Sequence, residues 1–167
     1  TRSELIGLWG EMYILIEYIA TNHPIGDAIK FWIGPENKKQ DFTLNQMALE
    51  TKTTMSGDGS LIRISSEEQL EKLTDKLYLI QLFINFSNTS ESLSLKNLYE
   101  RISDNIGSDL EVKTAFEHKI SRLYGKSTEE QQKQGFEYLA YNLYEVQEDF
   151  PKISGDNLDE GILRVKY

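Results

Sequence analysis

The chain has 167 residues, of which 39% are hydrophobic and 27% charged, a mixture typical of one globular domain and not of a disordered segment. It contains no cysteine, which excludes disulfides, thiolate metal sites and thiol catalysis, and no apolar run approaches the roughly 20 residues that span a bilayer. The 18 Lys and Arg against 27 Asp and Glu leave a net charge of −9, which argues against a sequence-independent grip on nucleic-acid phosphates.

The first predicted element is a helix over Ser3–Ala20 that is apolar on nearly every side, so we expect it to be buried. Glu11 lies in its middle, one turn after Gly7 and beside Gly10. Glycine inside a helix costs about 1 kcal/mol relative to alanine, so the two glycines indicate that another backbone passes close by. The helix is predicted to end at His23-Pro24.

The region after this helix alternates short apolar runs with turn residues, which is the pattern of a sheet. The predicted elements are the strands Ala28–Ile33, Gln40–Leu44, Met47–Thr54 and Leu61–Ile64, a helix from Ser65 to about Lys76, and the strand Leu77–Phe86. The last strand is nearly continuous in apolar residues, a pattern typical of a strand buried on both faces.

The C-terminal half adds two predicted helices, Leu95–Ile106 and Asp109–Tyr124, and a strand over Gly135–Val146. This order of elements predicts an α/β fold with a central mixed β-sheet flanked by helices and with additional C-terminal helices and strands. No linker divides the chain, so we expect one domain over 1–167, with its core at about 3–86 and a C-terminal elaboration at 87–167.

The stretch around Asn45-Gln46 carries the side chains that point to a chemistry. If these two residues form a hairpin turn, Asp41 lies directly opposite Glu50 on the neighbouring strand. Opposed residues have Cβ atoms about 4.5–5.5 Å apart, a distance at which two carboxylates repel each other. We therefore expect a cation between them, with Lys52 alongside, because Lys52 shares a strand face with Glu50.

Such a site suits metal-assisted hydrolysis of a phosphodiester. Mg²⁺ prefers oxygen ligands, takes one or two protein carboxylates and keeps several waters, whose pKa it lowers. Lys52 could orient or deprotonate such a water, although a lysine beside two acids is expected to stay charged and to act as an electrostatic stabiliser. Glu11 supplies a further ligand if its helix packs against the hairpin.

Other candidate motifs have simpler interpretations. A second Glu-x-Lys copy, Glu111-Val112-Lys113, lies in a helical, solvent-exposed pattern with no aspartate hairpin before it. His23 and His118 lack a neighbour at ligand spacing and are interpreted as loop or surface residues. The Gly57-Asp58-Gly59 turn lacks the Lys-Ser/Thr of a phosphate loop and is expected to close a hairpin.

The order helix-Glu, strand-Asp, strand-Glu-x-Lys, helix, strand resembles the core of the PD-(D/E)XK nuclease superfamily, which has the restriction-endonuclease-like fold. One bacterial branch, associated with phage-defence and restriction-like operons, is similar in more detail. The residues that carry this similarity are Gly7–Glu11, Trp32, Gly34-Pro35, Gln40–Phe42, Glu50–Thr53 and Ile64–Leu70. Gln40 departs from the superfamily pattern, which usually has a proline before the first acid.

The resemblance implies a role for each matching residue. It implies Lys52 as the catalytic lysine, Glu11 as an accessory acid on the first helix, and Gln69 as a polar residue near the site from the following helix. The expected metal-binding residues are Asp41, Glu50, Thr51 and Glu11, and the expected cofactor is Mg²⁺, for which Mn²⁺ can substitute.

Two functions follow from these observations. The first is a metal-dependent DNA endonuclease of a bacterial restriction or phage-defence system, with RNA left open as a substrate. The alternative is a catalytically inactive nuclease-fold subunit of a larger DNA-processing complex. We expect a cytoplasmic protein without a membrane segment, with DNA, protein subunits of a defence system and a second copy of the chain as partners. The acidic charge leads us to expect that a missing N-terminal region or a partner supplies much of the grip on DNA.

Overall fold

The computed structural model describes residues 1–36, 40–58 and 75–146. Its centre is a five-stranded mixed sheet with the strand order β1-β2-β3-β5-β4. The strands are β1 (Phe42–Leu44), β2 (Met47–Met55), β3 (Lys76–Phe86), β4 (Leu93–Ser94) and β5 (Gly135–Val146). β2 and β3 are parallel and the other neighbours are antiparallel, so the predicted α/β class with a mixed sheet is confirmed and is consistent with a nuclease-like fold.

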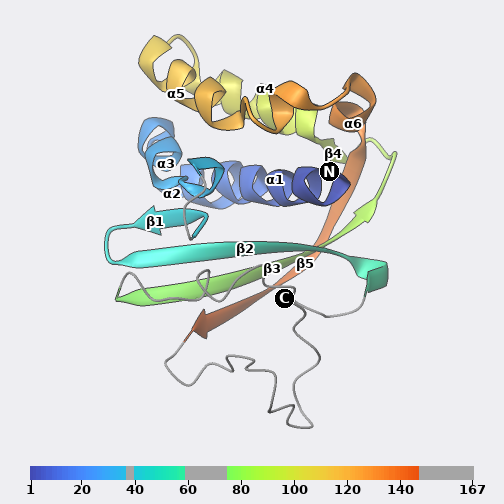
Figure 1. Cartoon of the computed structure of the whole chain (residues 1–167), viewed down its shortest axis with the longest axis horizontal. Coiled ribbons are helices and arrows are strands. Elements are labelled where there is room, and N and C mark those ends of the chain that lie inside the picture. The colour runs from blue at the N-terminus through green and yellow to red at the C-terminus, as the bar shows by residue number, and fades with distance from the viewer. Residues whose placement is uncertain (37–39, 59–74, 147–167) are drawn as a thin grey trace, which may run out of the picture.

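The helices lie in tiers on one side of this sheet (Figure 1). The α-helices are α1 (Arg2–Ile14), α2 (Ala20–Asn22), α3 (Ile25–Phe31), α4 (Leu95–Ile106), α5 (Leu110–Ile120) and α6 (Glu129–Lys133). A π-helical turn, Leu15–Ile19, joins α1 to α2, and short 3-10 turns lie at Gly34–Glu36, Ser56–Asp58 and Tyr124–Lys126. In the described ranges no helix combines the length and the apolar character that a membrane-spanning segment needs.

The first helix is buried, as its composition predicts. α1 lies between the sheet and α4, so both of its sides need apolar side chains (Figure 1). Trp9 and Met12 have no exposed surface and Leu8 is 2% exposed. The Trp9 indole N–H donates to the backbone carbonyl of Leu93, which satisfies the one polar group that this ring brings into the core.

Gly10 is the position at which the side chain of a neighbouring strand packs closely against α1. A Cβ on Gly10 would lie 1.8 Å from Thr53 Oγ1 and 3.1 Å from Thr53 Cβ in β2, whereas a Cβ on Gly7 would meet nothing within 4 Å. A close neighbour is therefore present at Gly10, although it is a side chain and not the expected backbone, and the expectation is wrong for Gly7. Because Glu11 follows Gly10 directly, this contact also places Glu11 beside the hairpin strands.

Gly10→Ala is expected to lower the free energy of unfolding by about 1–3 kcal/mol, because the added methyl group overlaps a side chain packed on the sheet. Gly7→Ala is its control: it should leave stability unchanged or raise it by up to about 1 kcal/mol through helix propensity. Urea unfolding followed by circular dichroism measures both. Equal effects of the two variants would show that α1 does not pack against β2 at Gly10.

The prediction of a strand over Ala28–Ile33 is wrong, because this run forms α3. Pro24 precedes the first turn as the N-cap residue, Asp27 lies in the first turn and Lys30 in the last, an order that suits a helix dipole. Only Trp32 retains a strand contact, an isolated antiparallel bridge to Phe42. A short apolar run fits either structure, and here the helix buries Ala28 and Ile29 completely.

The hairpin around Asn45-Gln46 has the predicted register. Phe42 pairs with Leu49, Thr43 with Ala48 and Leu44 with Met47. Asn45 has a φ of 53°, a left-handed conformation that asparagine tolerates in two-residue turns. Continued by one residue, this register places Asp41 opposite Glu50, although β1 itself begins only at Phe42.

Most of the remaining elements also agree with the sequence pattern. β3 is buried on both faces, with Leu79, Gln81 and Leu82 fully buried, and α4 and β5 have the predicted bounds. Asp109 caps α5, which ends at Ile120 rather than at Tyr124. The two-residue β4 was not predicted, and the predicted strand Leu61–Ile64 and helix after Ser65 lie outside the described residues.

Candidate active site

Three of the four central candidate residues come from the hairpin, and the fourth comes from α1. Asp41 directly precedes β1, and Glu50 and Lys52 alternate with Thr51 along β2. Through the parallel register, Glu50 lies beside Leu79 of β3 and Lys52 beside Gln81. Glu50 and Lys52 therefore share one face of the sheet near its β1 edge.

Asp41 is held through both its side chain and its backbone. Its Oδ2 accepts a hydrogen bond of 2.7 Å from the Thr51 backbone N–H. Its carbonyl accepts the backbone N–H groups of Ile33 and Gly34, at 2.8 and 2.9 Å. Thr51, predicted as a metal ligand, thus contributes its backbone to holding Asp41, while its own side chain is buried.

Glu11 reaches the same region from α1. Its Oε2 accepts a hydrogen bond of 2.7 Å from the Trp32 indole N–H. A Cβ on Gly34 would lie 2.7 Å from both Glu11 Oε2 and Asp41 Oδ1, so these two oxygens are no further apart than twice that distance. Gly34 therefore leaves space for two carboxylates that come from distant parts of the sequence.

Glu50 and Lys52 form a buried ion pair. Lys52 Nζ lies 2.8 Å from Glu50 Oε1, and the two side chains are 16% and 2% exposed. The other carboxylate oxygen, Glu50 Oε2, is buried and has no hydrogen-bond partner among the described residues. A buried carboxylate oxygen without a partner is costly, and it marks the position at which a cation or a donor would be stabilised.

Burial raises the pKa of all three carboxyl groups. The pKa of Asp41 is raised to about 6, although the Thr51 N–H and the Lys52 ammonium oppose the rise. The pKa of Glu50 is raised to about 8 by burial and by the charge of Asp41, against the effect of Lys52. The pKa of Glu11 is well above its ordinary value, first through burial and then through Asp41, with the Trp32 hydrogen bond opposing.

The donor set fits a divalent cation held by two protein carboxylates. Asp41 and Glu50 supply hard oxygen ligands, one of them the unpartnered Oε2, and Mg²⁺ typically takes only one or two carboxylates. No group of three or more Asp, Glu or His side chains gathers around one point in the described part of the chain. Glu11 thus lies beside the pair without completing a three-carboxylate cage.

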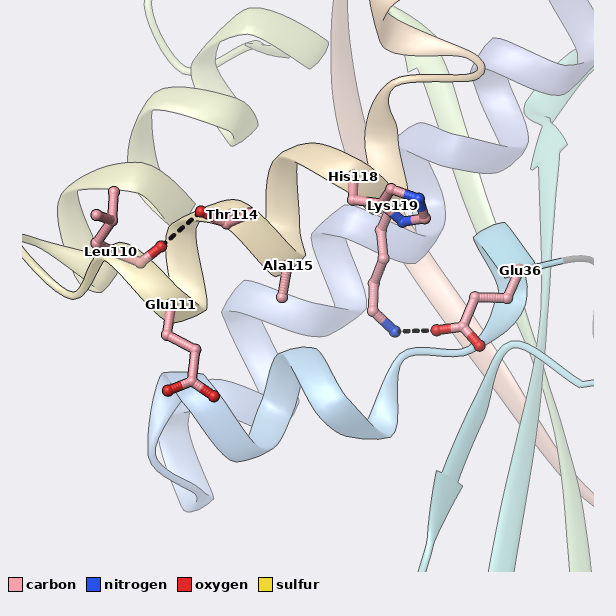
Figure 2. A pocket seen from close by; sticks show the side chains of 7 residues that line it. All are labelled: Glu36, Leu110, Glu111, Thr114, Ala115, His118 and Lys119. Carbon is pink, nitrogen blue, oxygen red and sulfur yellow. Dashed lines mark hydrogen bonds and ion pairs between the residues drawn. The ribbon is translucent and has the colours of Figure 1, made fainter.

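The other predicted features lie elsewhere. Gln69 is outside the described residues. Glu111 and Lys113 are exposed in the first turns of α5, so the second Glu-x-Lys copy has neither burial nor a partner hairpin. The groove shown in Figure 2 lies along α5 and includes none of the four candidate residues.

Trp32 and Gly34 are functional candidates whose roles the sequence did not reveal. Both belong to the residues that carry the family resemblance, which was the available signal. Trp32 contacts Glu11, which lies more than 20 positions earlier in the sequence, and Gly34 lies beside both Glu11 and Asp41. Only the folded chain reveals such contacts.

Gly34→Ala is expected to lower the activity of this site about 10- to 100-fold, because the methyl group displaces Asp41 Oδ1 and Glu11 Oε2 and small misplacements of reacting groups are costly. Gly125→Ala is the matched control, since Gly125 also lies in a 3-10 turn and a Cβ there meets nothing within 4 Å. Single-turnover cleavage of DNA, the reaction that the sequence leads us to expect, measures the effect. Equal rates for the two variants would contradict the tight packing around Gly34.

The whole chain matches one known protein family. The family model described as "Putative PD-(D/E)XK family member, (DUF4420)" matches residues 1–167. No curated protein and no solved structure gives a significant match. The family thus agrees with the resemblance read from the motifs, and PD-(D/E)XK nucleases are generally dependent on a divalent metal.

Proposed function

Because the chain belongs to this PD-(D/E)XK family, we propose that it is a metal-dependent endonuclease that hydrolyses phosphodiester bonds of DNA. The observation that carries the proposal is the grouping of Asp41, Glu50 and Lys52 on one hairpin, with Glu11 brought alongside by α1. Two carboxylates can hold a cation, and a cation together with an ammonium ion stabilises the negative charge that grows during phosphodiester hydrolysis.

Each residue has a distinct task in the proposed reaction. Asp41 and Glu50 would hold the cation, which when bound supplies Lewis-acid stabilisation of the phosphate and a more acidic water. Lys52 stabilises the negative charge that grows on the phosphate as water attacks phosphorus and the bond to the leaving alcohol breaks. Glu11, whose pKa is raised well above its ordinary value by burial, lies beside Asp41 and would act as an accessory acid.

We further propose that the protein acts in a bacterial restriction or phage-defence system and that Mg²⁺ is its ion. The similarity to a bacterial branch associated with such operons supports the first part, and the all-oxygen ligand set supports the second. The net charge of −9 supports the proposal that protein partners contribute to DNA binding.

Cleavage and metal binding together test this function. With Mg²⁺ or Mn²⁺ the purified protein should nick supercoiled plasmid DNA, EDTA should stop the reaction, and Asp41→Ala should abolish it. Asp104→Ala, which removes an exposed acid of α4, should change nothing. Isothermal titration with Mn²⁺ should show binding in the wild type and in Asp104→Ala and none in Asp41→Ala.

A non-catalytic subunit is the second candidate, favoured by the acidic charge of the chain. It predicts neither cleavage nor Mn²⁺ binding that depends on Asp41. Cleavage that survives Asp41→Ala would contradict the proposed active site.

A further inference from the structure

The segment Trp32–Glu36, which follows α3, contacts both Glu11 and Asp41. The Trp32 indole N–H donates to Glu11, and the backbone N–H groups of Ile33 and Gly34 donate to the carbonyl of Asp41. Gly34 also leaves the space in which the two carboxylates approach each other. The position of this segment therefore sets the positions of Glu11 and Asp41 together.

A lysine from α5 holds this segment from its other side. Lys119 Nζ donates to the backbone carbonyl of Trp32 and forms an ion pair of 2.8 Å with Glu36. Figure 2 shows the lysine reaching from α5 across to Glu36 at the end of the segment. Lys119 contacts Trp32 and Glu36 directly, so its route to Glu11 and Asp41 runs through Trp32–Glu36.

The burial of Lys119 makes these contacts specific. Its side chain is only 9% exposed, although lysine is among the residues most rarely buried. A buried ammonium ion is tolerated only where it is paired, and here the carbonyl of Trp32 and the carboxylate of Glu36 provide that pairing. The nearby Lys113 of the same helix is exposed and provides a natural comparison.

We propose that Lys119 is a positioning residue of the active site, acting through the carbonyl and indole of Trp32 on Glu11 and through Gly34 on Asp41. The proposal rests on the proposed function for its effect on catalysis, but not for its effect on Trp32. The proposal also means that the C-terminal half of the chain contributes to the site, since α5 lies far along the sequence from the hairpin and α1.

The indole resonances of the two tryptophans offer a readout that needs no activity. Trp32 donates to the carboxylate of Glu11, whereas Trp9 donates to the Leu93 carbonyl, which is not part of Trp32–Glu36. In ¹H–¹⁵N spectra, Glu11→Gln identifies the Trp32 indole peak by shifting it. Lys119→Met should move the same peak upfield, because the hydrogen bond weakens, while the Trp9 peak stays in place. Lys113→Met should move neither peak.

The activity arm separates positioning from simple stabilisation. Lys119→Met should lower kcat about 10- to 100-fold with little change in KM, and Lys119→Arg should recover most of the loss because it restores the charge and the donors. If Lys119→Met does not fold, Glu36→Gln weakens the same ion pair from an exposed position and should shift the Trp32 peak in the same direction.

Each result decides one question. An unchanged Trp32 peak in folded Lys119→Met, or in Glu36→Gln where the first variant fails to fold, would overturn the positioning role. A Trp32 peak that shifts in Lys119→Met, combined with a wild-type protein that cleaves no DNA, would uphold the positioning role and overturn the proposed function. Equal losses in Lys119→Met and Lys119→Arg, with the peak unmoved in both, would reduce Lys119 to a structural residue.

Discussion

Lys52→Met is expected to lower the rate of DNA cleavage by on the order of 10²–10³-fold, the loss typical of removing one preorganised charge from a developing oxyanion. Lys52 is mostly buried and ion-paired to Glu50, so its ammonium group is held in place before substrate arrives. Methionine keeps the length and the apolar stem of the side chain but removes the charge. Single-turnover cleavage of supercoiled plasmid with saturating Mg²⁺ measures the chemical step.

The chain contains a matched control for this experiment. Lys113 belongs to the second Glu-x-Lys copy, where it is exposed in α5 and has no aspartate hairpin nearby. Lys113→Met should therefore cleave at the wild-type rate. If Lys52→Met retained a rate within about threefold of the wild type, the electrostatic role of Lys52 would be wrong even if the protein is a nuclease.

The hairpin shows how much of the site the sequence could predict. Turn chemistry at Asn45-Gln46 and the alternation of a strand fix its register, because a slip by one residue would turn Phe42 away from the core. The opposition of Asp41 and Glu50 and the shared face of Glu50 and Lys52 follow from these local rules alone. Their roles in metal binding and catalysis stay predictions.

The contacts across the fold could not be predicted in the same way. α3 resembles a strand in sequence because its apolar run is short, and burial against the neighbouring helices adds to the local helix signals to select the helix. The bonds of Trp32 to Glu11 and of Lys119 to the Trp32 carbonyl depend on how α1, α3 and α5 pack. Helical periodicity indicates that such faces are buried, but not which partner each face meets.

Without metal, the protein is expected to lose stability as the pH rises from 5.5 to 8.5, and Glu50→Gln is expected to remove much of that loss. Burial raises the pKa of Glu50 to about 8 and that of Asp41 to about 6, so the folded chain binds protons that the unfolded chain has already released. The stabilisation from these protons is complete below the ordinary carboxyl pKa values of about 4 and disappears as the pH passes through the raised values.

Melting in EDTA measures this loss. One pKa unit corresponds to about 1.4 kcal/mol, and about 1 kcal/mol shifts the melting temperature of a chain of this size by roughly 2–4 °C, so a fall of about 5 °C or more is expected. Glutamine has nearly the shape of glutamate and carries no charge at any pH, so the difference between wild type and Glu50→Gln isolates this one carboxyl group. Glu111→Gln, which alters the exposed second copy, should melt with the wild-type pH profile.

Divalent cations should reverse the loss at pH 8.5, because they bind the ionised carboxylates of the folded state. At a concentration of 100 Kd, a ligand specific for the folded state contributes about 2.7 kcal/mol, enough to recover several degrees. Mn²⁺ should therefore raise the melting temperature of the wild type and of Glu111→Gln at pH 8.5 but not that of Glu50→Gln. A wild-type melting temperature that falls between pH 5.5 and 8.5 in EDTA no more than that of Glu50→Gln would contradict the raised pKa of Glu50. Recovery by Mn²⁺ in Glu50→Gln would place the cation elsewhere.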